Sequence, residues 1–315
     1  MTDTLIETNT PLINIENSMH ENAAMNYLLS LNSPLSREKM GYFLKVSARI
    51  LNNNNDILLC PWHKLKSTHV RAIMSHLANA GKAPNTIHGY VSALKGVARF
   101  AWILEQMSMT TYSHIKDVKL QKGYRIPKGR ALTKKETKDL FAACAADISS
   151  IGVRDQAIIA ILVGCGLRRS ELVKINIDDI CFTEQSILVL GKGNKERLSY
   201  MSDSVWSKVN YWITKVRGTH SGYLFCRIRK NNDIQDSNLT SQAIYEILLK
   251  RGVEAKIAKF SPHDLRRTYA SNLLNSNVNL MVIRDMLGHT SIKTTQKYIK
   301  TQDEKMKKAS ELIQV

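Results

Sequence analysis

Apolar residues recur at helix spacing through the first third of the chain. Between residues 18 and 110 they fall every three or four positions, in segments interrupted by residues that break helices. The interruptions are Ser33-Pro34, Asn52 to Asn55, Gly81 and Pro84-Asn85. This spacing places the apolar side chains on one face of each helix, so it predicts a compact domain of four or five helices. The last segment, from about 85 to 106, carries Lys95 and Arg99 on its polar face.

A second region with helix spacing starts near residue 131. Thr133 is followed three residues later by Glu136, the pattern of a capping box, which predicts a helix start. The next apolar segment, from Val153 to about Val163, has few polar positions, which predicts a central, buried helix. Gly164-Cys165-Gly166 ends that helix, and a short helix is expected to open at Arg168.

The spacing of the apolar residues then changes from the period of a helix to the period of a strand. Residues 186–190 and 197–201 are short and rich in β-formers, and a glycine-rich turn with Lys192 and Lys195 lies between them. This pattern predicts a β-hairpin with a basic tip. A helix is expected from Asp203 to about Val216, an edge strand over 223–226, and helices from Thr240 onward. The predicted fold class is mainly α with a small antiparallel β-sheet.

Between the two regions lies a basic stretch, residues 113–130. Six cations face one acid there, Asp117, and glycines and a proline interrupt any helix. The cations are Lys116, Lys119, Lys122, Arg125, Lys128 and Arg130. A solvated tether and a linker that crosses a phosphate backbone have the same composition, so both interpretations stay open. The expected organisation is a flexible tail over 1–17, a helical domain over 18–112, this linker, a second domain over 131–300 and a tail helix over 301–315.

Charge narrows the class of partner. The chain carries a formal net charge of +18, while its first 36 residues hold four acids and no Lys or Arg, so the remainder carries +22. A surplus of this size indicates a polyanionic partner such as nucleic acid. No apolar run is long enough to span a bilayer, so no membrane partner is expected. The five cysteines include no C-x-x-C pair, which favours a reducing cytoplasm and argues against a metal site.

Candidate chemistry is concentrated in the final quarter of the chain. His263 lies three residues before Arg266, His289 follows Leu287-Gly288, and Tyr298 comes nine residues after His289. Arginine can hold a phosphate with two hydrogen bonds, histidine can move a proton, and tyrosine can become a covalent nucleophile. Taken singly, each of these residues is more often an ordinary surface or packing residue.

The order and spacing of several motifs together are more specific than any single residue. The segments GCGLRRSEL, GKGNKERL, HDLRRTYAS and LGHTSIKTTQKYI resemble the tyrosine recombinase (phage integrase) family, most closely its compact Xer-type members. The resemblance covers the second region, about 130–315. It implies an α/β tyrosine-recombinase catalytic domain, preceded by a helical, SAM-like core-binding domain. By position, it assigns the active site to Arg168, Lys192, His263, Arg266, His289 and the nucleophile Tyr298, with Glu171 in support.

The same resemblance implies a mechanism. Tyr298 attacks a DNA phosphodiester to form a 3′-phosphotyrosyl bond and release a 5′-hydroxyl, and exchange with a partner duplex proceeds through a Holliday junction. No cofactor or metal is required. The implied partners are a double-stranded recombination site and three further protomers in a homo-tetramer, with a paralogous recombinase as an alternative, in the bacterial cytoplasm at the nucleoid. The tail 301–315 would dock on a neighbouring protomer.

Contacts to DNA are expected from basic residues outside the six catalytic positions. They are Lys95, Arg99, Lys116, Lys119, Lys122, Arg125, Lys128, Arg169, Lys195 and Arg267. Arg267 departs from the histidine that is common in the family after the H-x-x-R motif. Two other activities use the same scaffold: a type IB topoisomerase-like reaction and catalytically silent DNA binding. The sequence also leaves open whether the recombination moves a mobile element or resolves DNA multimers.

Overall fold

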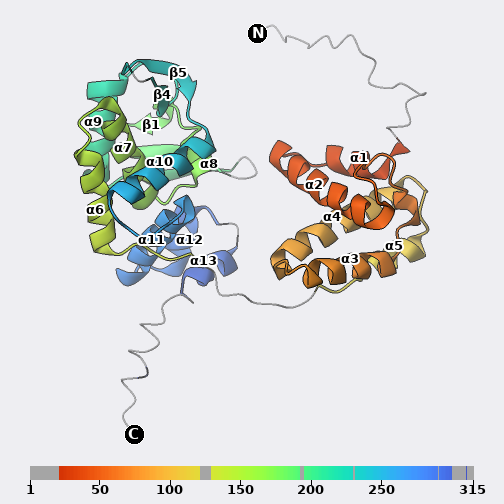
Figure 1. Cartoon of the computed structure of the whole chain (residues 1–315). Coiled ribbons are helices and arrows are strands. Elements are labelled where there is room, and N and C mark those ends of the chain that lie inside the picture. The colour runs from red at the N-terminus through yellow and green to blue at the C-terminus, as the bar shows by residue number, and fades with distance from the viewer. Residues whose placement is uncertain are drawn as a thin grey trace. The chain divides into compact units, whose positions relative to one another are not determined.

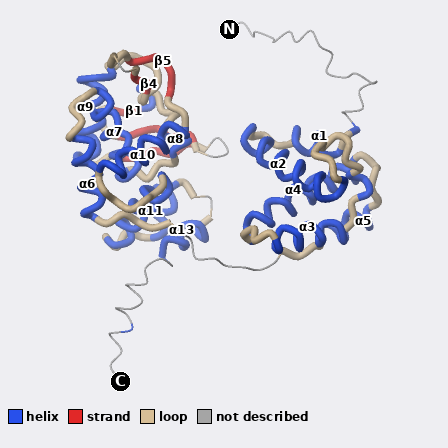
Figure 2. The backbone as a smooth tube through the Cα atoms, in the orientation of Figure 1, coloured by secondary structure: helices blue, strands red, loops and turns tan. Residues whose placement is uncertain are grey.

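The computed structural model describes residues 21–120, 129–191, 195–229, 231–289, 291–299 and 310. The chain divides into two compact units, Met1–Ile126 and Pro127–Val315, and each has its own hydrophobic core (Figure 1). Among the described residues, strands occur in the second unit alone (Figure 2). The predicted mainly α class with small antiparallel sheets is confirmed. The predicted tail at 1–17 lies outside the described residues, as does the tail helix at 301–315 apart from Ser310.

The first unit is a helical bundle around α4. Its elements are α1 (Ala23–Leu29), α2 (Pro34–Asn52), the 3₁₀ turn η2 (Trp62–Lys64), α3 (Ser67–Asn79), α4 (Pro84–Ile103) and α5 (Met109–Lys116). The helix α4 contacts each of the other four α-helices, and its apolar face, which includes Val91 and Leu94, is buried. The breaks read from Ser33-Pro34 and Pro84 fall at the starts of α2 and α4. Proline suits these positions because the first turn of a helix needs no backbone N–H donor.

The start of the predicted linker is corrected by the structure. Residues 113–116 belong to α5, and Ile115 and Val118 are buried in the core of the first unit. These two apolar residues, three positions apart, pack the segment against the core. Its many cations had suggested a solvated tether. Lys95 contributes to this docking, since its Nζ donates to the carbonyl oxygens of Lys116 and Val118 at 2.6 and 2.9 Å.

The second unit is built around the buried helix α7. Its helices are α6 (Lys134–Ala145), α7 (Ser150–Gly164), α8 (Arg169–Leu172), α9 (Asp203–Trp212), α10 (Ser241–Glu254), α11 (Pro262–Asn275), α12 (Leu280–Leu287) and α13 (Ile292–Ile299), with a 3₁₀ turn at Ile177–Asp179 and a π turn at Ile213–Arg217. Residues 157–162 of α7 are all buried, as predicted. The capping box is also confirmed: Glu136 N donates to Thr133 Oγ1 at 3.1 Å and Thr133 N to Glu136 Oε2 at 2.8 Å.

A three-stranded antiparallel sheet lies beside these helices. Its strands β1 (Ile180–Cys181), β2 (Ser186–Leu190) and β3 (Glu196–Tyr200) are arranged in that order. Leu188 pairs with Leu198 in the register of β2 and β3, which confirms the predicted hairpin.

The predicted edge strand at 223–226 is wrong. Leu224 and Phe225 turn into the core, and the segment adds a single bridge between Tyr223 and Asn176. A separate two-stranded sheet follows, made of β4 (Cys226–Ile228) and β5 (Ile234–Asn238). The apolar pair at 224 and 225 is therefore a core anchor between elements and not part of a strand.

None of the helices in the described ranges is both long enough and apolar enough to cross a membrane. The five cysteines are all free thiols. Cys60, Cys144, Cys165 and Cys226 are buried, and Cys181 is exposed. Most of them therefore act as small apolar core residues, as their scattered positions in the sequence predict.

Candidate active site

The turn that follows α7 brings Arg168 to the site. Gly166 has a φ of +63°, and a Cβ atom at this position would lie 2.3 Å from the ring of Tyr269. Both the backbone conformation and the close approach of the ring therefore require glycine here. The chain emerges from the buried helix in a fixed direction, and Arg168 stands at the N-cap of α8.

Glu171 holds Arg168 at the start of α8. Its Oε2 accepts the backbone N–H of Arg168 at 2.9 Å, while its Oε1 accepts from Arg168 Nη1 at 2.5 Å. The Glu171 side chain is 5% exposed and that of Arg168 is 35% exposed. Burial raises the pKa of Glu171, but hydrogen bonds from Arg197 and Arg168 outweigh it, so the net shift is downward and the carboxylate is ionised at neutral pH.

Arg266 lies inside the unit and joins two segments of the site. It projects from α11, whose first turn is fixed by Pro262 and by a capping box between Ser261 and Asp264. The Arg266 residue is 1% exposed. Its Nη1 donates to the carbonyl of Gly166 at 2.7 Å, and its Nη2 donates to the carbonyl of Leu287. One guanidinium thus ties the turn that carries Arg168 to the end of α12.

His289 follows that end of α12, and it is buried. Its Nδ1 lies 2.8 Å from Thr295 Oγ1 of α13, so the ring connects the last two helices. Desolvation, reinforced by the positive charges of Arg266 and Arg168, lowers the pKa of His289 to about 4. The imidazole is therefore neutral at pH 7. The helices α11, α12 and α13 contact one another at one end of the unit (Figure 1).

His263 stands on α11, three residues before Arg266. The residue is exposed, yet the packing around its ring and the charges of Arg266 and Arg267 lower its pKa. The pKa of His289 responds in turn to His263, so the two rings and the arginines lie within electrostatic range of one another. Two neutral imidazoles beside positive charges can accept a proton or donate a hydrogen bond at pH 7.

An open pocket of about 420 Å³ collects several of these side chains. It is lined by Arg168, Arg169, Ser170, Tyr245, His263 and Arg266 together with Leu167, Ser261 and Pro262. The lining comes from α8, α10 and α11, which lie far apart in the sequence. Three arginines and a histidine around one space, with no acidic residue in its lining, suit an anionic group such as a phosphate.

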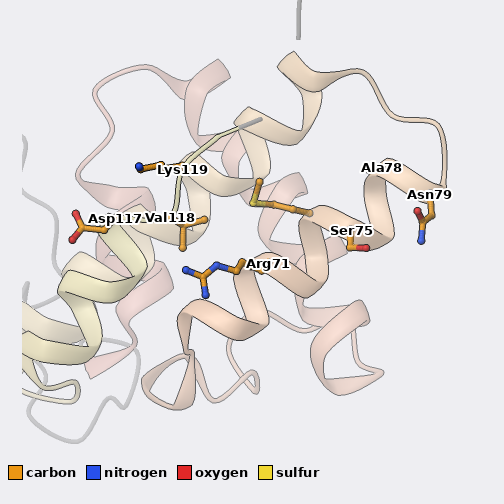
Figure 3. A pocket seen from close by; sticks show the side chains of 8 residues that line it. Arg71, Ser75, Ala78, Asn79, Asp117, Val118 and Lys119 are labelled. Carbon is orange, nitrogen blue, oxygen red and sulfur yellow. The ribbon is translucent and has the colours of Figure 1, made fainter. Parts of the chain in front are cut away.

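A larger pocket, of about 530 Å³, lies on the first unit (Figure 3). It is formed by Arg71, Ser75 and neighbouring residues of α3 and by Asp117, Val118 and Lys119 after α5. Its cations share the space with Asp117, and the lining holds no histidine, cysteine or tyrosine to act on a substrate. We therefore place the chemistry in the smaller pocket of the second unit.

Two of the six predicted catalytic side chains lie outside the described residues. They are Lys192 and the side chain of Tyr298, although the backbone of residue 298 belongs to α13. The structure brings the other four together: Arg168, His263 and Arg266 line the pocket, and the pKa of His289 responds to all three. In the described ranges no three His, Cys, Asp or Glu side chains gather as a metal site would require.

One residue of this site was missed from the sequence: Arg197 on β3. Its Nη2 donates to Glu171 Oε2 at 2.8 Å and its Nη1 to Oε1 at 3.3 Å. The side chain is 12% exposed. The alternation of inward and outward residues along the strand could have indicated it, because Arg197 shares the inward face of β3 with the buried Ser199. A charged residue on the inward face of a strand requires a partner.

The predicted DNA contacts have different surroundings. Arg267 is 8% exposed and its Nη1 donates to the carbonyl of Gly129 at 2.7 Å, so its guanidinium lies inside the unit, against the prediction that it contacts DNA. Lys95 is half-buried against α5, and Arg169 donates to the carbonyl of Ser241 at 3.4 Å. Arg99, Lys116, Lys119 and Lys195 are exposed. Lys122, Arg125 and Lys128 lie outside the described residues.

This chain is similar in sequence to known proteins. Residues 130–305 match the phage integrase family. The tyrosine recombinase XerC of Alcanivorax borkumensis is 31% identical over 243 residues, 76% of each chain. XerA of Pyrococcus furiosus is 30% identical over 239 residues, 76% of this chain and 77% of that one.

Solved structures share the fold at lower identity. The XerH recombinase bound to its difH substrate after cleavage has a TM-score of 0.64 and 21% identity, covering 91% of this chain and 78% of that one. The Tn1549 transposon integrase in complex with transposon right end DNA has a TM-score of 0.66 and 18% identity, covering 93% and 99%.

Proposed function

Because the chain belongs to the phage integrase family and is a site-specific DNA recombinase of the tyrosine class, we propose that it cuts and rejoins DNA through Tyr298 in the pocket of Arg168, His263 and Arg266. The observation that carries this proposal is the convergence of these three residues, from α8 and α11, on one space of about 420 Å³. The two alternatives raised by the sequence, a topoisomerase-like enzyme and a silent DNA-binding protein, are not favoured, since the relatives are named recombinases.

In the proposed reaction the phenol oxygen of Tyr298 attacks the phosphorus of a DNA phosphodiester. A bond forms between the tyrosine oxygen and phosphorus, and the bond from phosphorus to the 5′-oxygen breaks. The tyrosine proton passes to a base, and Lys192 gives a proton to the leaving 5′-oxygen. One phosphoester replaces another, so attack by a 5′-hydroxyl of a partner duplex can reverse the step. Two such exchanges give and resolve a Holliday junction.

Arg168 and Arg266 supply the positive charge. Negative charge develops on the non-bridging oxygens as the phosphorus becomes five-coordinate, and a fixed guanidinium stabilises it without reorganisation. Arg266 is held by two carbonyl oxygens and Arg168 by a buried carboxylate, so both are positioned before the substrate arrives. Loss of one fixed donor of this kind reduces a rate by about 10²–10³-fold.

The two histidines fit the remaining roles. A base for the tyrosine proton must be neutral before the reaction, and the pKa of His263 is lowered by its packing and by the adjacent arginines. We assign this role to His263. His289 is fixed by Thr295 and is neutral because burial and the surrounding arginines lower its pKa to about 4. We assign it a hydrogen bond to the phosphate.

The proposed partner is a double-stranded recombination site. The net charge of +18 supports this, and so do the XerH structure, which holds a difH substrate, and the Tn1549 integrase structure, which holds transposon right end DNA. We further propose a homo-tetramer on DNA in the bacterial cytoplasm, with the segment 301–315 docking on a neighbouring protomer. The reaction would serve the movement of a mobile element or the resolution of DNA multimers.

A suicide duplex tests the nucleophile. It carries a nick just beyond the cleaved phosphate, so the released fragment diffuses away and the covalent complex accumulates. Genomic fragments that bind Tyr298→Phe protein, once sequenced, give candidate sites for this duplex. Wild-type protein is expected to form an adduct that survives denaturation, and Tyr298→Phe is expected to form none.

Tyr211→Phe is the matched control, since Tyr211 is 54% exposed on α9 and away from the pocket. It should form the adduct as the wild type does. An adduct with Tyr298→Phe would disprove the assignment of the nucleophile.

A further inference from the structure

We propose that Arg197 is a positioning residue of the active site, which holds Glu171 and the turn at Gly288 so that the charge of Arg168 stays available for the phosphate. The inference rests on the proposed function, because it concerns how that site is kept in order. It adds to the six predicted catalytic positions a residue that touches none of the reacting atoms.

The first argument is the way in which Glu171 is shared. Its two oxygens receive four hydrogen bonds, from the backbone N–H and Nη1 of Arg168 and from Nη1 and Nη2 of Arg197. The three side chains together carry one net positive charge. Without Arg197, the single carboxylate would be left with Arg168 alone. The pair would then be neutral, and Arg168 would be drawn toward Glu171 and away from a substrate.

The second argument is the contact between Arg197 and the turn before His289. Gly288 has a φ of +62°, and a Cβ atom there would lie 3.1 Å from both Cδ and Nη1 of Arg197. The Arg197 side chain therefore packs directly against the backbone of Gly288. Since the following residue is His289, one side chain from β3 touches the segments that carry two proposed phosphate ligands, Arg168 and His289.

The third argument is the cost of an arginine at this position. The side chain is 12% exposed, and its buried Nε has no hydrogen-bond partner among the described residues. A buried donor without a partner costs about 1–3 kcal/mol. An aliphatic residue would avoid that cost and would fill the inward position of β3. The presence of an arginine at position 197 is therefore explained by its ion pair with Glu171 and not by packing.

The test compares two linkages at the cleaved position of the suicide duplex. One is the natural phosphodiester. The other is a methylphosphonate, in which a methyl group replaces one non-bridging oxygen, so the linkage is neutral and needs less positive charge to react. The measured quantity is the rate of covalent complex formation at saturating protein.

Arg197→Gln is expected to slow the reaction of the phosphodiester by about 10–100-fold, less than the loss of a direct phosphate ligand. With the methylphosphonate the deficit should shrink to within a few-fold of wild type, as it should for Arg168→Ala. Arg197→Lys keeps the positive charge but can make only a single contact, so its rate should fall between those of wild type and Arg197→Gln. The matched control is Glu196→Gln, an exposed residue one position earlier on β3, which should match wild type on both linkages.

Two outcomes overturn the inference. Either Arg197→Gln reacts as fast as wild type, or its deficit is the same on both linkages, which is the result for a general loss of structure. Melting temperatures and DNA affinities of all variants are measured in parallel, and if Arg197→Gln does not fold, Arg197→Lys carries the comparison. A wild-type protein that forms no adduct on either linkage would disprove the proposed function itself.

Discussion

Two clusters of arginines and carboxylates lie in the second unit, and they differ in balance. The first, which we call the closed cluster, consists of Arg154, Asp155, Asp147, Arg251 and Glu254. The second, the site cluster, consists of Arg168, Glu171, Arg197 and Arg266. The closed cluster holds three carboxylates for two arginines. The site cluster holds three arginines for one carboxylate.

Arg251 shows how complete the closed cluster is. Its Nε donates to Asp155 at 2.9 Å, its Nη1 to Glu254 at 2.9 Å and its Nη2 to Asp147 at 2.6 Å, and the side chain is 1% exposed. Every nitrogen of this guanidinium is used within the protein. In the site cluster, two of the three arginines line an open pocket. A cluster whose arginines are all paired with carboxylates therefore indicates stability. A cluster with surplus arginines beside a pocket indicates a site for an external anion.

The largest effect is expected in the closed cluster. Asp155→Asn leaves Arg154 and Arg251 without their shared charge partner, and Asp155 is 1% exposed. Breaking a buried ion pair from one side costs about 3–5 kcal/mol. Urea denaturation should show this loss, while the rate of adduct formation per folded molecule stays at the wild-type value. A reduced rate at unchanged stability would break the distinction between the clusters.

The next effect is expected in the site cluster, and in activity. Arg168→Ala should slow adduct formation by about 10²–10³-fold, because a fixed positive charge at the phosphate is lost. Its stability should change little, since Glu171 keeps both bonds from Arg197. Lys174→Ala, an exposed change just beyond α8, is the control and should alter neither quantity. If Arg168→Ala instead unfolds the protein, the site cluster is structural.

Acid should act on His289, which lies beside the site cluster, before it acts on the closed cluster. The pKa of His289 in the folded protein is about 4, against 6.5 as its ordinary value. Between these values the unfolded chain takes up a proton that folded His289 does not, so stability is full above pH 6.5 and falls as the pH drops toward 4. The slope is at most about 1.4 kcal/mol per pH unit for one proton.

His289→Gln should flatten that slope. Between pH 6.5 and 5 the carboxylates contribute little. Burial raises the pKa of Asp147 and of Glu171, but hydrogen bonds from Ser149 and Arg251 to the first and from Arg197 and Arg168 to the second outweigh it, so both net shifts are downward. The free energy of unfolding is measured across this interval for both proteins. An equal slope in wild type and variant would show that His289 is not the group responsible.

The smallest effect provides a baseline for the comparison. Lys135 and Asp139 form an ion pair at 3.0 Å on the surface of α6, with side chains that are 87% and 38% exposed. Lys135→Gln should cost only about 0.3–0.5 kcal/mol, since water and salt screen the pair. Urea denaturation in low and high salt measures it. A loss near that of Asp155→Asn would mean that burial does not set the cost of breaking an ion pair in this unit.

Much of the fold could be read from the sequence, because helix and strand periods are local. The bounds of α2, α3 and β2 follow from breakers and alternation, and the motifs around Arg168 and Arg266 indicated the pocket. The roles of individual arginines could not be read in this way. Arg251 meets Asp155 across 96 residues, and Arg197 meets Glu171 across 26. Which charges balance depends on contacts that only the tertiary fold creates.

The bond from Arg267 to Gly129 places a mechanical constraint on α11. Chain arriving from the first unit is fastened to this helix by that bond and, three residues later, by the donation of Leu132 N to Thr268 Oγ1 at 2.8 Å. On α11 these two attachment points, Arg267 and Thr268, directly follow Arg266. Tension along the polypeptide at Gly129 would therefore load α11 at Arg267, the residue next to the proposed phosphate ligand Arg266.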